Sequence, residues 1–230
     1  KKVGEIIKKI KKIKPKTVSL CAGNVATQEA AKFLIKLGVD IVKVGIGPGS
    51  ICTTRLVAGI GVPQLSAILN VKNAIKNKKV SIISDGGIKF SGDIAKALAA
   101  GADAVMIGSL FAGTDEAPGK IIRRSGKLFK SFRGMGSIGA MNRGSADRYY
   151  QLKQKDKSKY VAEGVEGYVK YKGRVDKIFY QLIGGLKSSM GYLGAKKINT
   201  LKQKPKFVKI TKAGFYESMV HNICLLYTSP

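Results

Sequence analysis

The stretch VSIISDGGIKFSGDIAKALAAGADAVMIGS, residues 80–109, decides the fold of this chain. It begins with an apolar run at residues 80–83, passes a glycine turn, and continues through residues 91–100, where apolar residues recur every three or four positions. A second apolar run at residues 104–107 ends in another glycine turn. Short β-branched runs predict strands, and the three-to-four spacing predicts an amphipathic helix. The stretch therefore predicts a strand, a helix and a second strand.

The same unit recurs toward the N-terminus. Apolar runs at residues 17–20 and 41–44 predict two further strands, and residues 3–13, 27–37 and 65–77 have helical spacing. Repeated strand–helix units form right-handed crossovers and a parallel sheet. Because each run is almost continuously apolar, we expect strands buried on both faces. A complete (β/α)8 barrel takes roughly 250 residues, so this α/β pattern predicts the second half of a TIM barrel, with the N-terminal half missing.

The regular pattern ends near Asp115. Residues 127–172 are rich in Gly, Arg, Lys and Tyr and show no core face, and so long a loop is usually functional or disordered. Helical spacing returns at residues 175–188, and residues 206–210 predict a last short strand. We therefore divide the chain into a half barrel (1–126), a mobile flap with a nucleotide-binding loop (127–172), a C-terminal helix and strand (173–223) and a tail (224–230).

The charge balance of the chain is strongly basic. The 230 residues include 42 Lys and Arg against 14 Asp and Glu, a formal net charge of +28, and 44% of them are hydrophobic, enough for a core. Such a charge brings acidic ligands, nucleic acids and anionic membranes into consideration. The lysines are scattered along the chain rather than gathered in one block, which indicates a compositional bias and disfavours nucleic acid as the primary partner.

The cysteine pattern excludes two classes of site. Cys21, Cys52 and Cys224 are widely spaced and are accompanied by one histidine, His221, so neither a disulfide scaffold nor a structural zinc site is a leading interpretation. No apolar run reaches the roughly 20 residues of a membrane span, and the Lys-rich start lacks the features of a signal peptide. We expect a soluble chain in the reducing cytoplasm, without a membrane partner.

The segment GIGPGSICTTR, residues 45–55, joins small residues to a cysteine on one turn. Backbone amides in such a loop can bind an anion and lower the pKa of a thiol. Two interpretations of Cys52 remain open from spacing alone: a nucleophile, or a structural cysteine buried behind a tight turn. Cys21 lies in an apolar run, and we expect it in the core.

Two further loops, SDGGI at residues 84–88 and IGS at residues 107–109, follow the last two predicted strands. Loops at this position in α/β barrels bind phosphate through backbone N–H groups, which glycine allows to approach closely. Asp85 is an acceptor that two ribose hydroxyls can share. A lone DGG is as often a plain turn as a site, but two such loops in register favour phosphate binding.

Together these motifs resemble those of the inosine 5′-monophosphate (IMP) dehydrogenases. The resemblance covers residues 18–220 and rests on residues 45–55, 84–119, SFRGMGSIGAM (131–141) and GSADRYYQ (144–151). It implies the oxidation of IMP to xanthosine 5′-monophosphate with NAD and water, in guanine nucleotide biosynthesis. The family's loop cysteine, here Cys52, attacks C2 of the hypoxanthine ring and forms a covalent thioimidate while a hydride passes to NAD. A mobile flap then replaces NADH, and water hydrolyses the adduct.

The resemblance also assigns roles to single residues. Arg148, beside Tyr149, is the base that activates the water, a role that the reference pKa of arginine does not explain, and Thr54 assists. Gly45, Ile46 and Gly47 contact NAD, and Glu163 contacts the purine. The other substrate-binding residues are Ser50, Asp85, Gly86, Gly87, Gly108, Ser109, Phe132, Arg133, Gly134, Met135 and Gly136. The alternative interpretations are that Arg148 is a surface cation and Glu163 a loop carboxylate.

One substrate-binding position departs from the family. Phe132 stands where relatives commonly carry Tyr, so one hydroxyl donor to the phosphate is absent. Because one hydrogen bond to a charged group is lost, we expect weaker nucleotide binding with the chemistry retained.

The cysteine loop further resembles a potassium site. The backbone carbonyls of Gly47, Gly49 and Cys52 would meet residues from a neighbouring subunit, namely Glu217, Ser218 and Met219, the last in place of a histidine common in bacterial members. Oxygen ligands from the backbone tolerate such a change. Since the ligands come from two chains, the resemblance implies K⁺ binding and a homotetramer.

Two other functions remain as alternatives. Guanosine monophosphate (GMP) reductase would use the same cysteine to expel ammonia with NADPH, and we expect it to lack the Ser109 loop and the long flap. A basic nucleic-acid-binding protein would show binding that falls steeply with salt. An open half barrel exposes sheet edges and an apolar interior, so we expect the chain alone to be inactive and poorly soluble. Residues 224–230 do not resemble the family's tail, and we expect them to be non-native.

Overall fold

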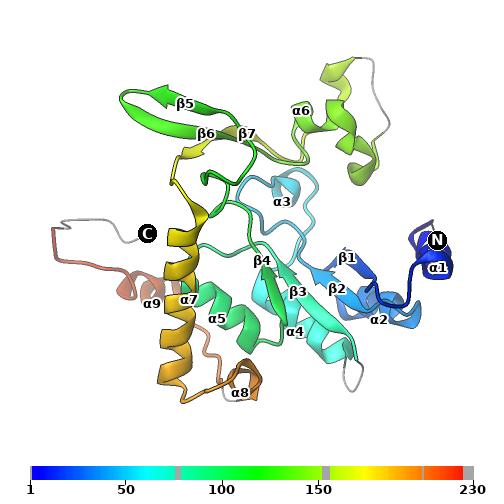
Figure 1. Ribbon diagram of the computed structural model, residues 1–230, viewed down its shortest axis with the longest axis horizontal. Helices are drawn as coiled ribbons and strands as arrows, with labels where there is room; N and C mark the ends of the chain where they lie inside the picture. The colour runs from blue at the N-terminus through cyan, green and yellow to red at the C-terminus, as the bar shows by residue number, and fades with distance from the viewer. Residues whose placement is uncertain (1, 76–78, 152–155, 204, 225–230) are drawn as a thin grey trace.

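A parallel sheet forms the centre of the molecule (Figure 1). The computed structural model describes residues 2–75, 79–151, 156–203 and 205–224. Its four strands are β1 (Cys21–Val25), β2 (Ile41–Val44), β3 (Ser81–Asp85) and β4 (Ala104–Met106), paired in that order. Because all pairs are parallel, the carboxyl ends of the strands meet at one edge. The expected α/β fold is confirmed.

The helices that connect the strands cover one face of the sheet. They are α2 (Gln28–Lys36), α4 (Gln64–Ile75) and α5 (Ser91–Ala99), with α1 (Lys2–Ile13) beside α2. These spans confirm the helical spacing at residues 3–13, 27–37 and 91–100. The expected helix at 65–77 is confirmed as far as Ile75, because residues 76–78 lie outside the described residues.

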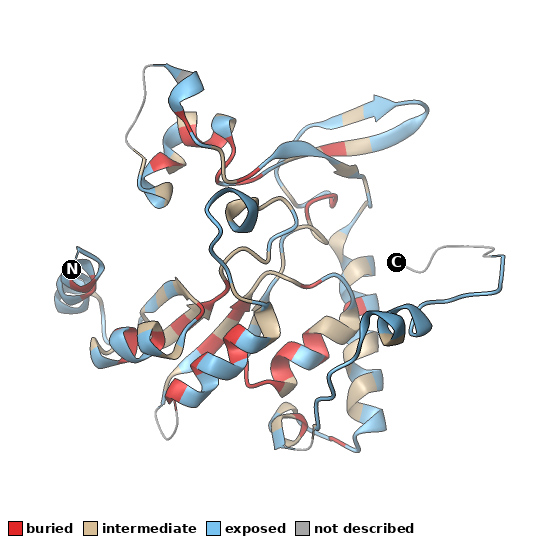
Figure 2. Cartoon of the chain, turned by 180° about the vertical axis from the view of Figure 1, so that it is seen from behind, coloured by how far each residue is buried: buried red, intermediate tan, exposed pale blue. Residues whose placement is uncertain are grey.

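The hydrophobic core lies between the sheet and these helices (Figure 2). Val42 and Val44 of β2 and Ile82 of β3 are buried, whereas the alternate residues Lys43 and Ile83 are half-buried. The expectation of strands buried on both faces is therefore wrong for this chain. The helices cover one face, and no described element covers the concave face, so burial alternates with a period of two.

The first strand begins four residues later than predicted. Residues 17–20 lead into the sheet, and pairing starts with Cys21 opposite Ile41. The Leu20 N–H donates to the Asp40 carboxylate at 2.7 Å, and its carbonyl accepts from Asp40 and Ile41. These bonds occupy both backbone groups of Leu20 before the ladder begins. Cys21, expected in the core, is exposed on the concave face.

A second, antiparallel sheet lies above the parallel sheet in Figure 1. Its strands are β5 (Ile121–Arg124), β6 (Lys127–Arg133) and β7 (Glu166–Lys170). The expectation of no core face over residues 127–172 is wrong, since Met141, Ala146 and Tyr160 form a small buried cluster within it, and β6 and β7 occupy its two ends. The missed signal is the two-residue turn Ser125-Gly126, with φ of 46° and 74°, between runs rich in β-branched and aromatic residues.

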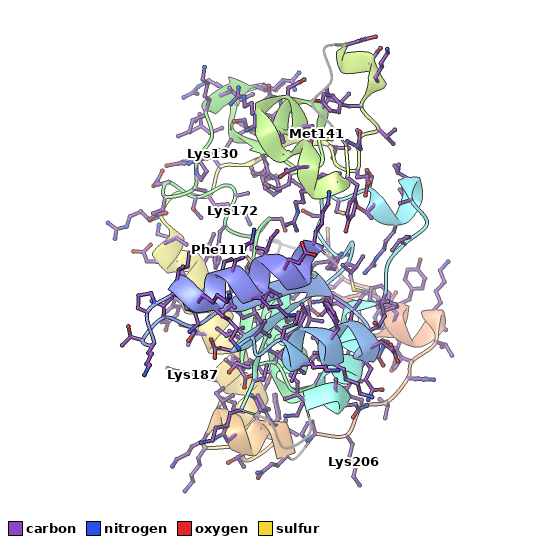
Figure 3. The ribbon with its side chains drawn as sticks, turned by 90° about the vertical axis from the view of Figure 1, so that its right-hand side faces the viewer. Phe111, Lys130, Met141, Lys172, Lys187 and Lys206 are labelled. Carbon is purple, nitrogen blue, oxygen red and sulfur yellow. The ribbon has the colours of Figure 1, made fainter. Side chains whose placement is uncertain are left out.

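Short helical turns connect β6 to β7. They are α6 (Ile138–Ala140), the π-helical turn η1 (Met141–Ser145) and the 3-10 turns η2 (Ala146–Tyr149) and η3 (Lys157–Lys159). Met141, Ala146 and Tyr160 form a small core of their own beneath them. Figure 3 shows Met141 among these turns, away from the parallel sheet.

Two side-chain contacts join the segment after β4 to the antiparallel sheet and to a C-terminal helix. The Lys130 side chain is 3% exposed, and its ammonium donates to the carbonyls of Thr114 and Asp115 after β4, at 2.5 and 3.1 Å. Phe111 stacks on Phe179 of the long helix α7 (Val175–Tyr192), with ring centroids 5.1 Å apart. Lys130 and Phe111 are labelled in Figure 3.

The C-terminal part consists of α7, α8 (Ile198–Gln203) and α9 (Lys212–Glu217). The expected helix at 175–188 is confirmed and extends further. The expected strand at 206–210 is wrong, because these residues pair with no described strand and Val208 is 82% exposed. The expectation about the tail falls largely on residues 225–230, which lie outside the described residues. No helix among the described residues is long and apolar enough to cross a membrane.

A side-chain cap at α5 gives the first prediction. Asp93 accepts from the backbone N–H groups of Lys89 and Phe90, both at 3.0 Å. Burial alone would raise the pKa of Asp93, but hydrogen bonds from Lys96, Lys89 and Phe90 outweigh it and lower the pKa below its usual value. Asp93→Ala should therefore reduce the free energy of unfolding by about 1 kcal/mol at neutral pH.

The pH dependence of that loss follows from the lowered pKa. A depressed folded-state pKa gives stability that is present above the unfolded pKa and lost as pH falls through the folded value. The difference between native and Asp93→Ala proteins in urea unfolding should thus shrink below pH of roughly 4. Asp93→Asn, which keeps an acceptor but no charge, serves as the control. A difference that stays constant with pH would refute the assignment.

Candidate functional site

A cavity of about 450 Å³ opens at the carboxyl ends of β2, β3 and β4. Both glycine loops and the cysteine loop face it, as the barrel topology predicts. The residues expected in the site that line it are Gly45, Gly47, Gly49, Ser50, Cys52, Asp85, Gly86, Gly87, Gly108, Ser109, Phe132, Arg133, Gly134, Met135, Gly136, Arg148, Tyr149 and Glu163. Residues far apart in the sequence are therefore brought to one cavity.

The cysteine loop is fixed by backbone hydrogen bonds. Its own turn is closed by the Cys52 N–H, which donates to the Gly49 carbonyl at 3.1 Å. On its far side, Thr53 N–H donates to the backbone carbonyl of Glu163 at 2.9 Å, and Val165 N–H donates to that of Ile51 at 3.0 Å. These two bonds form an antiparallel bridge between Cys52 and Gly164. The thiol is thereby held between β2 and the segment before β7.

The turn after β6 completes this arrangement. Gly134 N–H donates to the Val165 carbonyl, and Glu163 N–H donates to Gly136, both at 2.9 Å. A Cβ on Gly136 would lie 2.8 Å from Cζ of Tyr149 and 2.9 Å from the carbonyl carbon of Glu163. Three chain segments thus meet here at distances that only glycine permits.

The thiol of Cys52 has one hydroxyl partner. Its Sγ lies 3.2 Å from Oγ1 of Thr54, the first residue of the short helix α3 (Thr54–Val57). The guanidinium of Arg55 donates to the carbonyls of Val62 and Ile46, at 2.6 and 3.2 Å. Because Arg55 joins both ends of the loop, it limits how far the thiol can move.

Tyr149 lies in the electrostatic environment of the thiol. Burial raises the pKa of Tyr149, while the Arg148 guanidinium opposes the rise through its charge and a hydrogen bond. The negative charges of Cys52 and Glu163 add to the rise. Tyr149 is therefore a neutral donor at ordinary pH, close to a cation, a thiol and a carboxylate.

A second cavity, of about 530 Å³, shares Cys52, Arg148 and Tyr149 with the first. Gly45 and Gly47 line both cavities, while Ile46 and Thr54 line the second alone. The cysteine thus stands where two adjoining spaces meet, so two ligands could reach it from different sides.

Several lining residues were missed in the sequence. Asn24, Lys43 and Met106 line the first cavity from the concave face of the sheet, and Ile51 and Gly164 flank the cysteine. Lys43 could have been found, since a lysine inside the otherwise apolar strand IVKV is rarely buried without a partner. Asn24 could not, because it was placed in a loop that the structure makes part of β1.

The structure does not bring the potassium-site residues together within one chain. Gly47, Gly49 and Cys52 share the cysteine loop, but Glu217, Ser218 and Met219 lie at the end of α9, on the other side of α7 in Figure 1. Among the described residues, no three His, Cys, Asp or Glu side chains are grouped to hold a metal ion.

These features define an α/β domain with a parallel sheet that presents a cysteine thiol to a cavity lined by glycine loops. The family model for the IMP dehydrogenase / GMP reductase domain matches residues 1–221, and the chain belongs to this family. The resemblance stated from the motifs is thereby confirmed.

Among curated relatives, the inosine-5′-monophosphate dehydrogenase of Chlorobaculum tepidum is 56% identical over 215 residues, 93% of this chain and 44% of that protein. The enzyme of the same name from Methanocaldococcus jannaschii is 55% identical over 236 residues, 100% of this chain and 48% of that protein. The chain thus spans about half the length of the curated relatives it matches.

A solved structure of GMP reductase from Trypanosoma brucei, in complex with guanosine 5′-monophosphate, is also similar. It superposes with a TM-score of 0.85 and 47% identity, over 96% of this chain and 45% of that one. Coverage this complete must include most of residues 127–172, so the expectation that reductases lack that segment is wrong for this relative.

A glycine substitution tests how the site is assembled. Gly136→Ala should push Tyr149 and Glu163 away from the cysteine loop, because its Cβ has no room. Cys52 should then react severalfold faster with iodoacetamide, measured by peptide mass mapping. Gly167→Ala on β7 is the control, since no described atom lies within 4 Å of its added Cβ. Equal rates in all three proteins would contradict this account.

Proposed function

We propose that the protein containing this chain oxidises IMP to xanthosine 5′-monophosphate with NAD⁺ and water, in guanine nucleotide synthesis. Relatives named as inosine-5′-monophosphate dehydrogenases at 52–57% identity support this reading. The observation that carries it is the first cavity, whose lining joins Cys52, Asp85 and two glycine loops. This set of groups suits a nucleotide, since the glycine loops can bind its phosphate, Asp85 its ribose and Cys52 its base.

The substrate's orientation follows from the lining. Backbone N–H groups of Gly86, Gly87, Gly108 and Ser109 can hold the phosphate, together with Ser50. Asp85 accepts the ribose hydroxyls. The purine then extends toward Cys52, where Met135 and Glu163 border the cavity. This pose places C2 of the base next to the thiol.

In the first step the Cys52 thiolate adds to C2 of the hypoxanthine ring, forming a carbon–sulfur bond. The C2 hydrogen departs with its electron pair, and NAD⁺, when bound, supplies the acceptor for that hydride. The thiol proton leaves to solvent, with Thr54 as the nearest hydroxyl at 3.2 Å. The product of this step is a thioimidate on Cys52.

In the second step water adds to C2 and the cysteine leaves as thiolate, giving xanthosine 5′-monophosphate. Arg148 and Tyr149 line both cavities beside the cysteine, which places them to orient this water, and the family resemblance assigns the role of its base to Arg148. The charge of Arg148 acts on the Tyr149 hydroxyl, so the two side chains are electrostatically coupled. We propose that the turns between β6 and β7, the central part of residues 127–172, move in as the reduced cofactor leaves.

The residues present fit a dinucleotide. Gly45, Ile46 and Gly47 border the second cavity, which reaches the same thiol as the first. We propose that the nicotinamide end of NAD⁺ lies there, facing C2 of the bound nucleotide.

Potassium binding, assembly and location extend this proposal. Gly47, Gly49 and Cys52 lie on one turn, so their carbonyl oxygens can share a K⁺ ion with Glu217, Ser218 and Met219 of a neighbouring copy. A site divided between copies requires association of the chain, and we propose a homotetramer. We propose the cytoplasm as its location, since free cysteines suit a reducing compartment.

GMP reductase is the second candidate. The similarity to the Trypanosoma brucei reductase over 96% of this chain favours it enough to require a test. That reaction would expel ammonia from C2 of guanosine 5′-monophosphate, and NADPH would supply the hydride. Primary nucleic-acid binding has no comparable support, since the cavities and the family both point to nucleotides.

Intact mass spectrometry tests the assignment. The complete gene product, quenched during turnover of IMP with NAD⁺, should carry a nucleotide-sized adduct and produce NADH. Cys52→Ala should show neither, whereas Cys21→Ala, which removes an exposed thiol outside both cavity linings, should behave as the native protein. Ammonia release from guanosine 5′-monophosphate with NADPH, without the IMP reaction, would assign the reductase instead.

The phosphate end of the cavity gives a separate prediction. Phe132, on β6, lines the cavity where a hydroxyl could reach the phosphate. Phe132→Tyr should lower the KM for IMP by roughly 10- to 100-fold, the worth of one hydrogen bond to a charged group, with kcat little changed. Phe129→Tyr, on the same strand but outside the cavity lining, is the control. An unaltered KM for Phe132→Tyr would contradict the proposed contact between residue 132 and the phosphate.

A further inference from the structure

Three adjacent strands each contribute a polar side chain to one point of the first cavity. The Lys43 ammonium lies 3.0 Å from Oδ2 of Asp85, and the Asn24 amide donates to the same oxygen at 2.9 Å. Asn24 belongs to β1, Lys43 to β2 and Asp85 to β3. Neither Lys43 nor Asn24 has a role in the function proposed above.

The backbone explains why these side chains converge. Gly23 pairs with Lys43 and Val25 with Val44, so Asn24 is the extra residue of a β-bulge. A bulge redirects its side chain out of the regular alternation, which lets Asn24 reach across β2 to Asp85. Lys43 points to the concave face because its neighbours Val42 and Val44 are buried under the helices.

The orientation of the Asn24 amide is determined by its partners. Its Nδ2 faces two acceptors, the Gly45 carbonyl and Asp85 Oδ2, both at 2.9 Å. In a flipped amide, Oδ1 would face these same two acceptors, and both hydrogen bonds would be lost. Asn24 therefore donates both of its protons, one of them to Asp85.

The carboxylate of Asp85 is held by one oxygen only. Both donors contact Oδ2, and no hydrogen bond among the described residues reaches Oδ1. The side chains of Lys43 and Asp85 are 25% and 24% exposed, so the pair is shielded more than a surface ion pair. The other side of the ammonium lies against the Met106 sulfur at 3.9 Å. Asp85 thus keeps one oriented acceptor that faces the cavity.

We propose that Lys43, assisted by Asn24, is a positioning residue that fixes Asp85 so that Oδ1 accepts a ribose hydroxyl, and that this contact selects ribonucleotides over deoxyribonucleotides. The inference rests on the proposed function, in which Asp85 contacts the ribose. An ionised carboxylate only accepts, so a substrate without the hydroxyl leaves a desolvated charge without its donor. Sites built around such a bond reject the analogue that lacks it.

Competition between IMP and its 2′- and 3′-deoxy analogues tests this, using the complete gene product. The native protein should favour IMP over one of the analogues by roughly 10- to 100-fold in kcat/KM. Lys43→Met should bring that ratio close to one, mainly by raising the KM for IMP, while Lys43→Arg should restore part of it. A merely structural role would lower kcat/KM for all three substrates equally and leave the ratio unchanged, which would overturn the proposal.

The matched control is Lys14→Met, which breaks a similar ion pair with Asp40 at 3.7 Å, outside the lining of the first cavity. It should leave the ratio at its native value. Asn24→Ala should lower the ratio less than Lys43→Met does, and it carries the test should Lys43→Met fail to fold. An unchanged ratio in that variant would also overturn the proposal.

A double-mutant comparison separates positioning from direct contact. If Lys43 acts through Asp85, then Lys43→Met should add little to the loss of selectivity already caused by Asp85→Asn. Additive losses would mean that Lys43 contacts the nucleotide itself and would overturn the positioning role. If the native protein fails to turn over IMP at all, the proposed function fails instead, so the two failures are distinguishable.

Discussion

The backbone hydrogen bonds between the cysteine loop and residues 163–165 are the constraint on which the site depends. They join a loop of the parallel sheet to the segment that enters β7, across more than a hundred residues of sequence. Without them Cys52 would face open solvent, and the turns that carry Arg148 and Tyr149 would have no fixed base. The glycines at 134, 136 and 164 serve this junction, because side chains there would separate the segments.

Much of the parallel sheet and its helices could be predicted because their signals are local. Helical spacing and apolar runs identified three of the four strands and the helices around them. The start of β1 was misplaced because its pairing depends on Leu20 and Asp40, a contact between distant residues. The antiparallel sheet was missed for a different reason: its strands are mostly exposed, so the Ser125-Gly126 turn was the only strong local signal.

The candidate site was predicted more fully than the fold around it, since long motifs fix residue types where periodicity cannot. Its glycine loops, Cys52 and the Arg148-Tyr149 pair all line the cavities. What no motif revealed is the layer behind them. Lys43 and Asn24 act through side-chain directions that a strand register and a β-bulge determine. Neither the register nor the bulge can be predicted from the sequence. Contacts between copies of the chain likewise depend on side-chain positions that the sequence motifs do not determine.

The two cavities have lining residues in common. Because Cys52, Arg148 and Tyr149 line both, a molecule in one space forms part of the wall of the other. Each ligand therefore alters the affinity for its neighbour, and the coupling is reciprocal. The two ligands would then bind and leave in a defined order, because the first ligand to bind completes the binding site of the second. The shared wall would in this way set the sequence of binding events as well as their chemistry.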